Sequence, residues 1–147
     1  MGLRFSWVDR SEGETNMSDK IYHIAVKVPD IDEAKGFYKD IFGFEELKQD
    51  KVRDHTSCHL TDGGLDLAII EYESEASPEA GLAGPGACIH HIGVEVDDLE
   101  SYQQKLLNKG CKIVSAPGVL PVKFNTPHGV LWEIVPEGYF QKTINGE

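Results

Sequence analysis

The chain is poor in cysteine. Its three cysteines, Cys58, Cys88 and Cys111, are scattered over 147 residues and stand in no Cys-x-x-Cys spacing. An odd, dispersed set of this kind favours reduced, mostly buried thiols over a disulfide framework. Thiols stay reduced in the cytoplasm, so we expect a cytoplasmic protein.

Long apolar runs and an excess of basic charge are also missing. No stretch approaches the roughly 18 apolar residues of a membrane span, so no membrane partner is expected. Lysine and arginine number 14 against 25 acidic residues, which gives a formal net charge of −11. Nucleic acid is a poor partner for such a chain, because phosphate binding requires a basic face. The remaining composition, 40% apolar and 27% charged, is that of a soluble globular protein.

The first 16 residues differ from the rest of the chain. We expect residues 1–16 to be a poorly ordered extension and residues 17–147 to be a single domain. The extension lacks the roughly 7–15-residue apolar region of a secretory signal, so it is not interpreted as one.

One sequence pattern occurs twice in the domain. HIAVKVPD begins at His23 and HIGVEVDD begins at His91, 68 residues later, with the same order of apolar, polar and acidic positions. A repeat of this length predicts two half-size modules, each starting with a strand that carries a histidine.

Hydrophobic periodicity gives both modules the same order of elements: strand, helix, three strands. The predicted fold class is therefore α+β, with two repeated βαβββ modules. The first module spans about residues 20–73, with strands at 21–28, 44–47, 56–60 and 65–72, a helix at 31–42 and a charged segment at 49–55 between strands. A linker follows at 74–86, and the second module spans about 87–136, with strands at 89–96, 111–115, 122–125 and 130–135, a helix at 99–108 and a partly helical or coiled tail.

The first helix is expected to begin at an acidic cap and to bury one face. Its apolar residues fall at helical spacing, and the aromatic ones are interpreted as core. These residues are Ala34, Phe37, Tyr38, Ile41 and Phe42.

Three strand-borne side chains form a candidate metal site: His23, His91 and Glu133. Alternate residues of a strand share a face, so His23 faces with Ala25 and His91 with Gly93, and these small neighbours would leave room for a ligand. Glu133 is an acid in an otherwise apolar strand, and a buried carboxylate is costly unless it is paired or binds a metal. Two imidazoles and a carboxylate suit a divalent ion with open positions. A single strand histidine is more often an ordinary core residue, but the repeated placement favours a metal.

At these residues the chain resembles the vicinal oxygen chelate superfamily, which includes glyoxalase I, methylmalonyl-CoA epimerase, extradiol dioxygenases and bleomycin-resistance proteins. The resemblance covers residues 21–136 and rests on the segments HIAV, AKGFY, FG, IHH and TPHG and on Glu133. It implies a cupped mixed sheet around one metal cleft, and a homodimer. It assigns one divalent ion (Zn, Mn, Co, Ni or Fe) to His23, His91 and Glu133.

The chain departs from glyoxalase I at the fourth ligand position. Aligning Gly64 with Gly129 places Ala68 opposite Glu133, and alanine cannot coordinate a metal. Glyoxalase I has a carboxylate there, so its usual mechanism is disfavoured, whereas three-ligand sets are typical of extradiol dioxygenases. Asp66 has the correct parity to substitute, and Glu71 lies on the opposite face.

Further residues are weaker candidates. His59, Lys123, Phe124 and His128 lie on or beside strands expected to border the cleft, where they would contact substrate. Asp66 is a further weak candidate for substrate contact. His59 is equally well explained as a satisfied strand histidine. Lys123 would bind a carboxylate or phosphate, or else be a solvated edge charge, which we favour.

Two more interpretations concern side chains beside the site. His90 is expected to face away from His91, at the surface or an interface. Tyr139 and Phe140 would either cover the cleft or pack between subunits.

The predicted function is that of a metal-dependent isomerase or lyase acting on a small molecule with neighbouring oxygens. The ion would stabilise an enolate or oxyanion, and Glu133 would contribute to proton transfer. The sequences of the linker and of the IHH segment are most similar to those of the epimerase branch. The alternatives are a non-haem iron oxygenase and a metal-free binding protein of the bleomycin-resistance kind.

Overall fold

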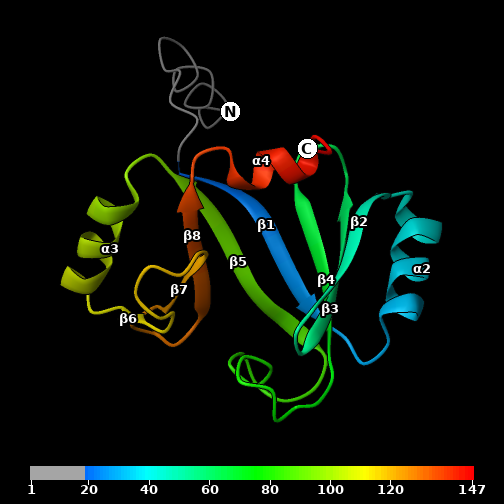
Figure 1. The fold of residues 1–147 in the computed structure, drawn as a ribbon, viewed down its shortest axis with the longest axis horizontal. Coiled ribbons are helices and arrows are strands. Elements are labelled where there is room, and N and C mark those ends of the chain that lie inside the picture. The colour runs from blue at the N-terminus through cyan, green and yellow to red at the C-terminus, as the bar shows by residue number, and fades with distance from the viewer. Residues whose placement is uncertain (1–18) are drawn as a thin grey trace, which may run out of the picture.

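The computed structural model of the protein describes residues 19–147 (Figure 1). The predicted extension over residues 1–16 lies outside this range. The strands are β1 (Lys20–Lys27), β2 (Glu45–Val52), β3 (His55–Thr61), β4 (Asp66–Tyr72), β5 (Cys88–Val96), β6 (Lys112–Ile113), β7 (Val122–Asn125) and β8 (Leu131–Pro136). The helices are α2 (Ile31–Phe42), α3 (Leu99–Asn108) and α4 (Tyr139–Ile144).

All eight strands belong to one sheet, in the order β2-β3-β4-β1-β5-β8-β7-β6. Within each half, the first and last strands are parallel neighbours: β1 with β4, and β5 with β8. The halves join where β1 and β5 run antiparallel at the centre. Strand, helix and three strands therefore occur twice in chain order, which confirms the predicted α+β class.

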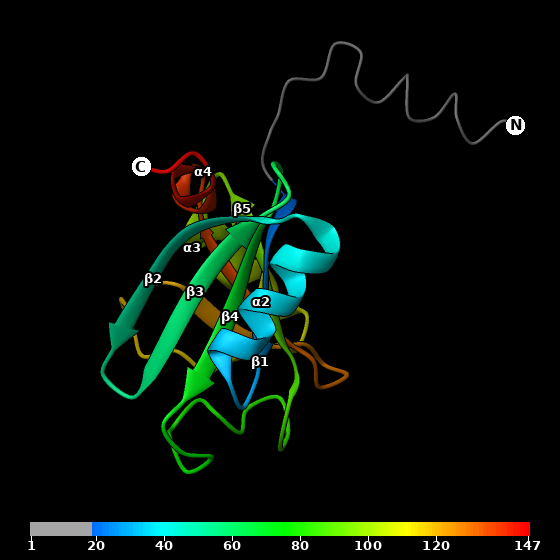
Figure 2. The same ribbon diagram turned by 90° about the vertical axis from the view of Figure 1, so that its right-hand side faces the viewer.

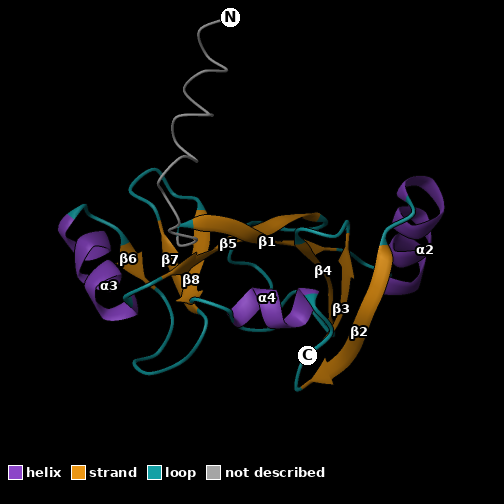
Figure 3. Ribbon diagram, turned by 90° about the horizontal axis from the view of Figure 1, so that it is seen from above, coloured by secondary structure: helices purple, strands orange, loops and turns teal. Residues whose placement is uncertain are grey.

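The sheet is cupped, and the helices divide between its two sides. Seen from above, the sheet curves around α4, whereas α2 and α3 lie outside it at opposite ends (Figure 3). The view from the side shows α2 packed along the outer side of β3 and β4 (Figure 2). The inner side of the curve is therefore the one available for a cleft.

The two module helices start and stop at local signals. Asp30 accepts a hydrogen bond from the backbone of Glu33, and Asp98 accepts one from the backbone of Ser101, so each carboxylate caps the first turn. Gly43 ends α2 in the left-handed conformation at φ 72°, which glycine adopts without steric cost. Both predicted helix ranges are confirmed.

The charged segment at 49–55 is not a break between strands, as the sequence suggested. It belongs to the hairpin of β2 and β3, which are paired from Glu45↔Thr61 to Val52↔His55. Because β2 is the edge strand of the sheet, its charged side chains stay in water and protect the open edge. Loss of apolar alternation therefore marks an exposed edge here and not a loop.

The expectation that the aromatic residues of α2 form core is wrong for two of them. Phe37 is 54% exposed and Phe42 is 59% exposed. The buried contacts of α2 come from Ile31, Ala34 and Tyr38, which pack on a cluster formed with Cys58, Leu60 and Ile69. The inward stripe of the helix is thus narrower than its apolar composition suggests.

The linker between the modules is held by a buried lysine. Lys27 is 2% exposed, and its ammonium group donates to the carbonyl oxygens of Ala80 at 2.6 Å and Gly84 at 2.8 Å. Glu75 balances the charge at 3.1 Å. This anchor fixes a segment that carries no helix or strand and brings it beside the site.

Helix α4 is tied to the sheet by one buried carboxylate, Glu95 of β5. Both of its oxygens accept hydrogen bonds, from the backbone of Gly138, Phe140 and Gln141 and from the Gln141 amide, at 2.7–3.0 Å. The side chain is fully buried. The tail, expected to be partly helical or coiled, is helical over Tyr139–Ile144, and this helix is fixed over the inner side of the sheet.

Among residues 19–147, no helix is both long and apolar enough to cross a membrane.

Candidate metal centre

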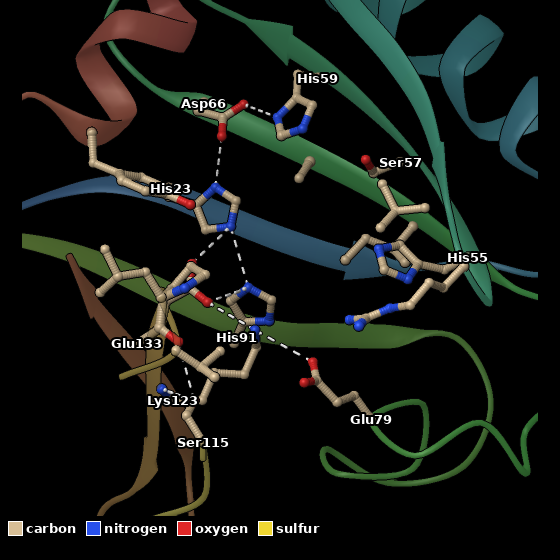
Figure 4. Close-up of a pocket in the computed structure, with 18 of the residues that line it drawn as sticks. His23, His55, Ser57, His59, Asp66, Glu79, His91, Ser115, Lys123 and Glu133 are labelled. Atoms are coloured by element: carbon tan, nitrogen blue, oxygen red, sulfur yellow. Dashed lines mark hydrogen bonds and ion pairs between the residues drawn. The ribbon is translucent and has the colours of Figure 1, made fainter. Parts of the chain in front are cut away.

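The inner side of the sheet holds a cleft of about 950 Å³, lined by both modules (Figure 4). His23 and Asp66 reach it from the first module, and His91, Lys123 and Glu133 from the second. His55, Ser57 and His59 line the wall formed by β3, and the linker contributes Glu79. The structure therefore brings together the residues that the sequence placed at equivalent positions of two distant segments.

His23, His91 and Glu133 converge at the floor of the cleft. Their donor atoms lie within 4.8 Å of one another, and all three side chains are buried. Nε2 of His23 is 3.2 Å from Nε2 of His91 and 3.4 Å from Oε2 of Glu133. Nε2 of His91 is 3.2 Å from Oε1 of Glu133.

A bulge in β5 places two adjacent histidines on the same side of the sheet. Ala25 pairs with His91 and Val26 pairs with Ile89, so His90 is an extra residue opposite the partner strand. Both His90 and His91 are buried, and their Nδ1 atoms are 2.8 Å apart. The expectation that His90 faces away is therefore wrong, because simple strand alternation fails at a bulge.

Hydrogen bonds determine which nitrogen of His91 is free. Nε2 of His90 donates to the Glu79 carbonyl oxygen at 2.8 Å. Burial lowers the pKa of His90 to about 4, so its ring is neutral and its Nδ1 carries no proton. Nδ1 of His91 must then donate to it, which leaves the Nε2 lone pair of His91 directed at the cluster.

His23 is oriented by a carboxylate in the same way. Asp66 is 1% exposed, and its Oδ2 accepts from Nδ1 of His23 at 2.7 Å. Its Oδ1 accepts from Nδ1 of His59 at 2.8 Å. Burial alone would raise the pKa of Asp66, but these two hydrogen bonds outweigh it and lower that pKa. Asp66 is therefore not a substitute fourth ligand: both its oxygens are used behind the imidazoles.

Glu133 is ionised and sits beside a buried ammonium group. Burial alone would raise its pKa, but the contacts with His91, His23 and Lys123 lower the pKa of Glu133 to about 2. Nζ of Lys123 lies 3.3 Å from Oε1 of Glu133 and 3.3 Å from Oε1 of Glu79. The interpretation of Lys123 as a solvated edge charge is wrong, since its side chain is only 13% exposed.

The cluster has the properties of a site for a cation. Two imidazole nitrogens with free lone pairs and a carboxylate face one another, so acceptors meet acceptors. Oε1 of Glu133 is buried and accepts no hydrogen bond from residues 19–147, although Lys123 is near. Ligands bound at about 2.0–2.1 Å to one ion lie roughly 3 Å apart, close to the separations found here. The donor set therefore fits a divalent metal ion.

Strand register confirms the predicted equivalence of Ala68 and Glu133. Ala25 pairs with Ala68 in the first module, and Gly93 pairs with Glu133 at the corresponding place in the second. The first module thus contributes a methyl group where the second contributes a carboxylate. No fourth His, Cys, Asp or Glu joins the cluster within the described part of the chain.

The small residue Gly93 was expected to leave room for a ligand, but the space beside it is filled. A Cβ at Gly93 would lie 2.6 Å from the Phe140 ring. That ring stacks on His23 with centroids 4.5 Å apart and planes 2° from parallel. Phe140 therefore covers the site from α4, and glycine is needed in β5 because the ring comes so close.

Two of the weaker candidates lie elsewhere. Phe124 belongs to the core under α3, with Val96, Val122 and Ile134, and does not line the cleft. Its neighbour Lys123 takes the inner side of β7, so alternation sends Phe124 outward. His128 lies exposed in the turn before β8 and also misses the cleft.

Two residues that shape the site were not singled out from the sequence, and a third was left between two roles. Glu79 lies in a linker without periodicity, so no signal marked it. Glu95 shares the inward parity of His91 and Gly93, and the reasoning that selected Glu133, a lone acid in a strand, applies equally to it. Phe140 was considered for covering the cleft without a way to decide.

A protein family and two relatives match this chain in sequence. The model of the Glyoxalase/Bleomycin resistance protein/Dioxygenase superfamily matches residues 20–134. The chain is 28% identical over 104 residues to the ethylmalonyl-CoA/methylmalonyl-CoA epimerase of Cereibacter sphaeroides, covering 68% of this chain and 78% of that protein. It is 30% identical over 125 residues to a probable lactoylglutathione lyase of Synechocystis, covering 81% and 89%.

Solved structures show the same fold. A methylmalonyl-CoA epimerase in complex with methylmalonyl-CoA and NH4+ superposes with a TM-score of 0.68 at 24% identity, over 84% of this chain and 97% of that one. A variant of the Streptomyces coelicolor methylmalonyl-CoA epimerase in complex with 2-nitronate-propionyl-CoA gives a TM-score of 0.67 at 25% identity, over 82% and 99%.

Proposed function

The chain belongs to the Glyoxalase/Bleomycin resistance protein/Dioxygenase superfamily, and from that premise we propose that it is a metal-dependent isomerase or lyase. Its substrate would be a small molecule with two neighbouring oxygens, of which the acyl-CoA esters named for its relatives are the first to test. The observation that carries the proposal is the convergence of His23, His91 and Glu133 on one buried point.

The three converging side chains would hold the ion. When bound, a divalent ion would act as a Lewis acid and stabilise the negative charge left on substrate oxygens after proton removal. Asp66 and His90 keep the two imidazoles in the tautomer that such a role requires. Phe140 excludes water from one side of His23, which strengthens electrostatic interactions at the floor of the cleft.

A second candidate is a non-haem iron oxygenase. The three-donor set favours it, because two histidines and one carboxylate with open positions are typical of non-haem iron oxygenases. Alanine at position 68 leaves the site with three donors. This favours the oxygenase and counts against the usual ligand set of glyoxalase I. Both candidates require the metal, and they differ in whether oxygen is consumed.

The first experiment is metal analysis of the purified protein. We expect one equivalent of a divalent metal per chain in the wild type, and its loss in His91→Ala with an unchanged circular dichroism spectrum. His128→Ala is the matched control, since it removes an exposed histidine outside the cleft and should keep the metal. A wild type without affinity for divalent metal would leave a binding protein of the bleomycin-resistance kind.

The second experiment separates the two enzyme classes. Deuterium incorporation into methylmalonyl-CoA in D2O, followed by mass spectrometry, measures proton transfer. Oxygen uptake with a panel of catechols measures oxygenase activity. Deuterium exchange without oxygen uptake supports the isomerase or lyase; oxygen uptake without exchange replaces it with the oxygenase.

A further inference from the structure

The third strand of each module places an ionisable side chain beside the fourth-strand position of the site. His59 of β3 pairs with Ala68, and Lys123 of β7 pairs with Glu133. Because Ala68 and Glu133 are themselves equivalent by register, His59 and Lys123 are counterparts in the two modules. Both line the cleft.

The two counterparts differ in whether they have a nitrogen atom available to a bound molecule. The ammonium group of Lys123 lies between two carboxylates, Glu79 and Glu133, at 3.3 Å from each. His59 makes one hydrogen bond, from Nδ1 to Asp66 at 2.8 Å. Its second nitrogen, Nε2, has no hydrogen-bond partner among residues 19–147. A free basic nitrogen therefore exists on the first-module side alone.

The ring of His59 is fixed, and a molecule in the cleft can reach it. Its side chain is 17% exposed, whereas the carboxylate that holds it is 1% exposed. His55, Ser57 and His59 project from the same side of β3 into the cleft (Figure 4). Since Ala68 ends at its methyl group, the pairing position beside His59 holds no competing polar side chain.

Asp66 links this nitrogen to the metal centre through a single carboxylate. One oxygen accepts from His59 and the other from His23, so both rings donate from Nδ1 and turn Nε2 toward the cleft. A carboxylate that accepts from an imidazole also stabilises the imidazolium formed when Nε2 takes a proton. The pair Asp66–His59 therefore has the arrangement of an oriented general base.

We propose that His59 is the proton-transfer base of the reaction; this rests on the proposed function. Nε2 of His59 removes a proton from the substrate carbon next to a carbonyl group. The C–H bond breaks, an N–H bond forms, and the electron pair remains in the carbon–oxygen system of the substrate. Return of the proton from Nε2 to the carbon, or to the neighbouring oxygen, restores the free base.

The rival role for His59 is structural support of His23 through Asp66. A residue with that role would influence metal binding, because partners that orient a ligand typically contribute about 10–100-fold to metal affinity. A proton-transfer base would instead influence turnover and leave affinity unchanged. The two readouts separate the roles.

The test compares His59→Asn with Asp66→Asn in the metal-loaded protein. The substitution His59→Asn retains a donor for Asp66 and removes the basic nitrogen. We expect deuterium exchange of methylmalonyl-CoA by His59→Asn to have a kcat lowered by about 100-fold or more, with KM and Zn²⁺ affinity close to wild type. Asp66→Asn should weaken Zn²⁺ binding by about 10–100-fold.

Chemical rescue provides a readout that a structural role would not move. Imidazole added to His59→Ala should restore part of the exchange rate, in proportion to its unprotonated form. Full activity of His59→Asn alongside an active wild type would overturn the assignment of His59 and leave the proposed function standing. A wild type that binds Zn²⁺ but exchanges no deuterium would contradict both.

Discussion

The two histidines at the floor of the cleft each have a hydrogen-bond partner at Nδ1, and this partner determines that Nε2 keeps its lone pair. His91 presents the lone pair of Nε2 because its Nδ1 donates a hydrogen bond to His90. His90 can accept that bond because its other nitrogen donates to the Glu79 carbonyl oxygen. His23 presents a lone pair because Asp66 accepts from it. The ability of each ring to bind a metal therefore depends on a residue that is not itself a candidate ligand.

Lys123 should limit the affinity of the site for a cation. Its ammonium group is 3.3 Å from Oε1 of Glu133, so it repels an ion held by that carboxylate. Lys123→Met keeps the length of the side chain and removes the charge, and we expect Zn²⁺ to bind about tenfold more tightly. Isothermal titration calorimetry measures the change.

Lys112→Met is the control for that measurement, because Lys112 is exposed on β6 and does not line the cleft. Weaker binding in Lys123→Met would mean that the ammonium group is needed to hold Glu133 in place.

At this scale the sequence was sufficient to select the three side chains that converge, but not their hydrogen-bond partners. His23 and His91 stood out because a repeat placed them equivalently, and Glu133 because an acid in an apolar strand needs a reason. The role of His90 depended on a bulge, which changes strand parity without leaving a mark in the residue pattern. Asp66 was noticed for its parity and given the wrong role.

The pairing of whole strands makes Ala68 the place where a fourth ligand would enter. Its register matches that of Glu133, and it lines the cleft. Ala68→Glu should bring a second carboxylate toward the ion and tighten Zn²⁺ binding by about tenfold, measured by competition with a chelator. Ala76→Glu adds the same charge on the exposed linker and should leave the affinity unchanged.

The close contact between β5 and α4 should make the stability of the protein sensitive to a larger residue at position 93. Gly93→Ala would place a Cβ 2.6 Å from the Phe140 ring and 3.0 Å from Cβ of His23. The ring must move, and we expect a loss of about 1–3 kcal/mol in the free energy of unfolding, measured by urea denaturation.

Gly36→Ala serves as the control, because nothing lies within 4 Å of a Cβ there and α2 should gain up to about 1 kcal/mol from alanine. A Gly93→Ala variant as stable as wild type would show that α4 yields easily.

Element types and order were predictable because caps, turns and periodicity are local. The start of α2 was expected at an acidic cap, which Asp30 provides, and the range of α3 followed from its periodicity. The edge strand β2 was not recognised as continuous, because an edge is exposed and loses alternation. The exposed faces of Phe37 and Phe42 depended on how α2 lies against the sheet, which is a tertiary property.

For the whole molecule, metal binding should appear as resistance to unfolding. The candidate ligands come from both modules and meet at one point, so an ion that binds them would link the two halves of the sheet. Free Zn²⁺ at about 100 times its dissociation constant should add about 2.7 kcal/mol to the free energy of unfolding and raise the Tm by several degrees.

Differential scanning calorimetry measures the shift, which EDTA should reverse and His91→Ala should lack. An equal shift in His91→Ala would locate the stabilising ion elsewhere. The homodimer stays a prediction for this protein, and analytical ultracentrifugation measures it.

Helix α4 is synthesised after the strand residue to which it is attached. Glu95 leaves the ribosome 43 residues before Gly138 and 46 before Gln141, the donors that later surround it. Without those residues, the carboxylate of Glu95 would lack these donors and the ring of Phe140 would be absent from His23. A chain that contained both modules but lacked residues 138–147 would therefore have an open floor to the cleft.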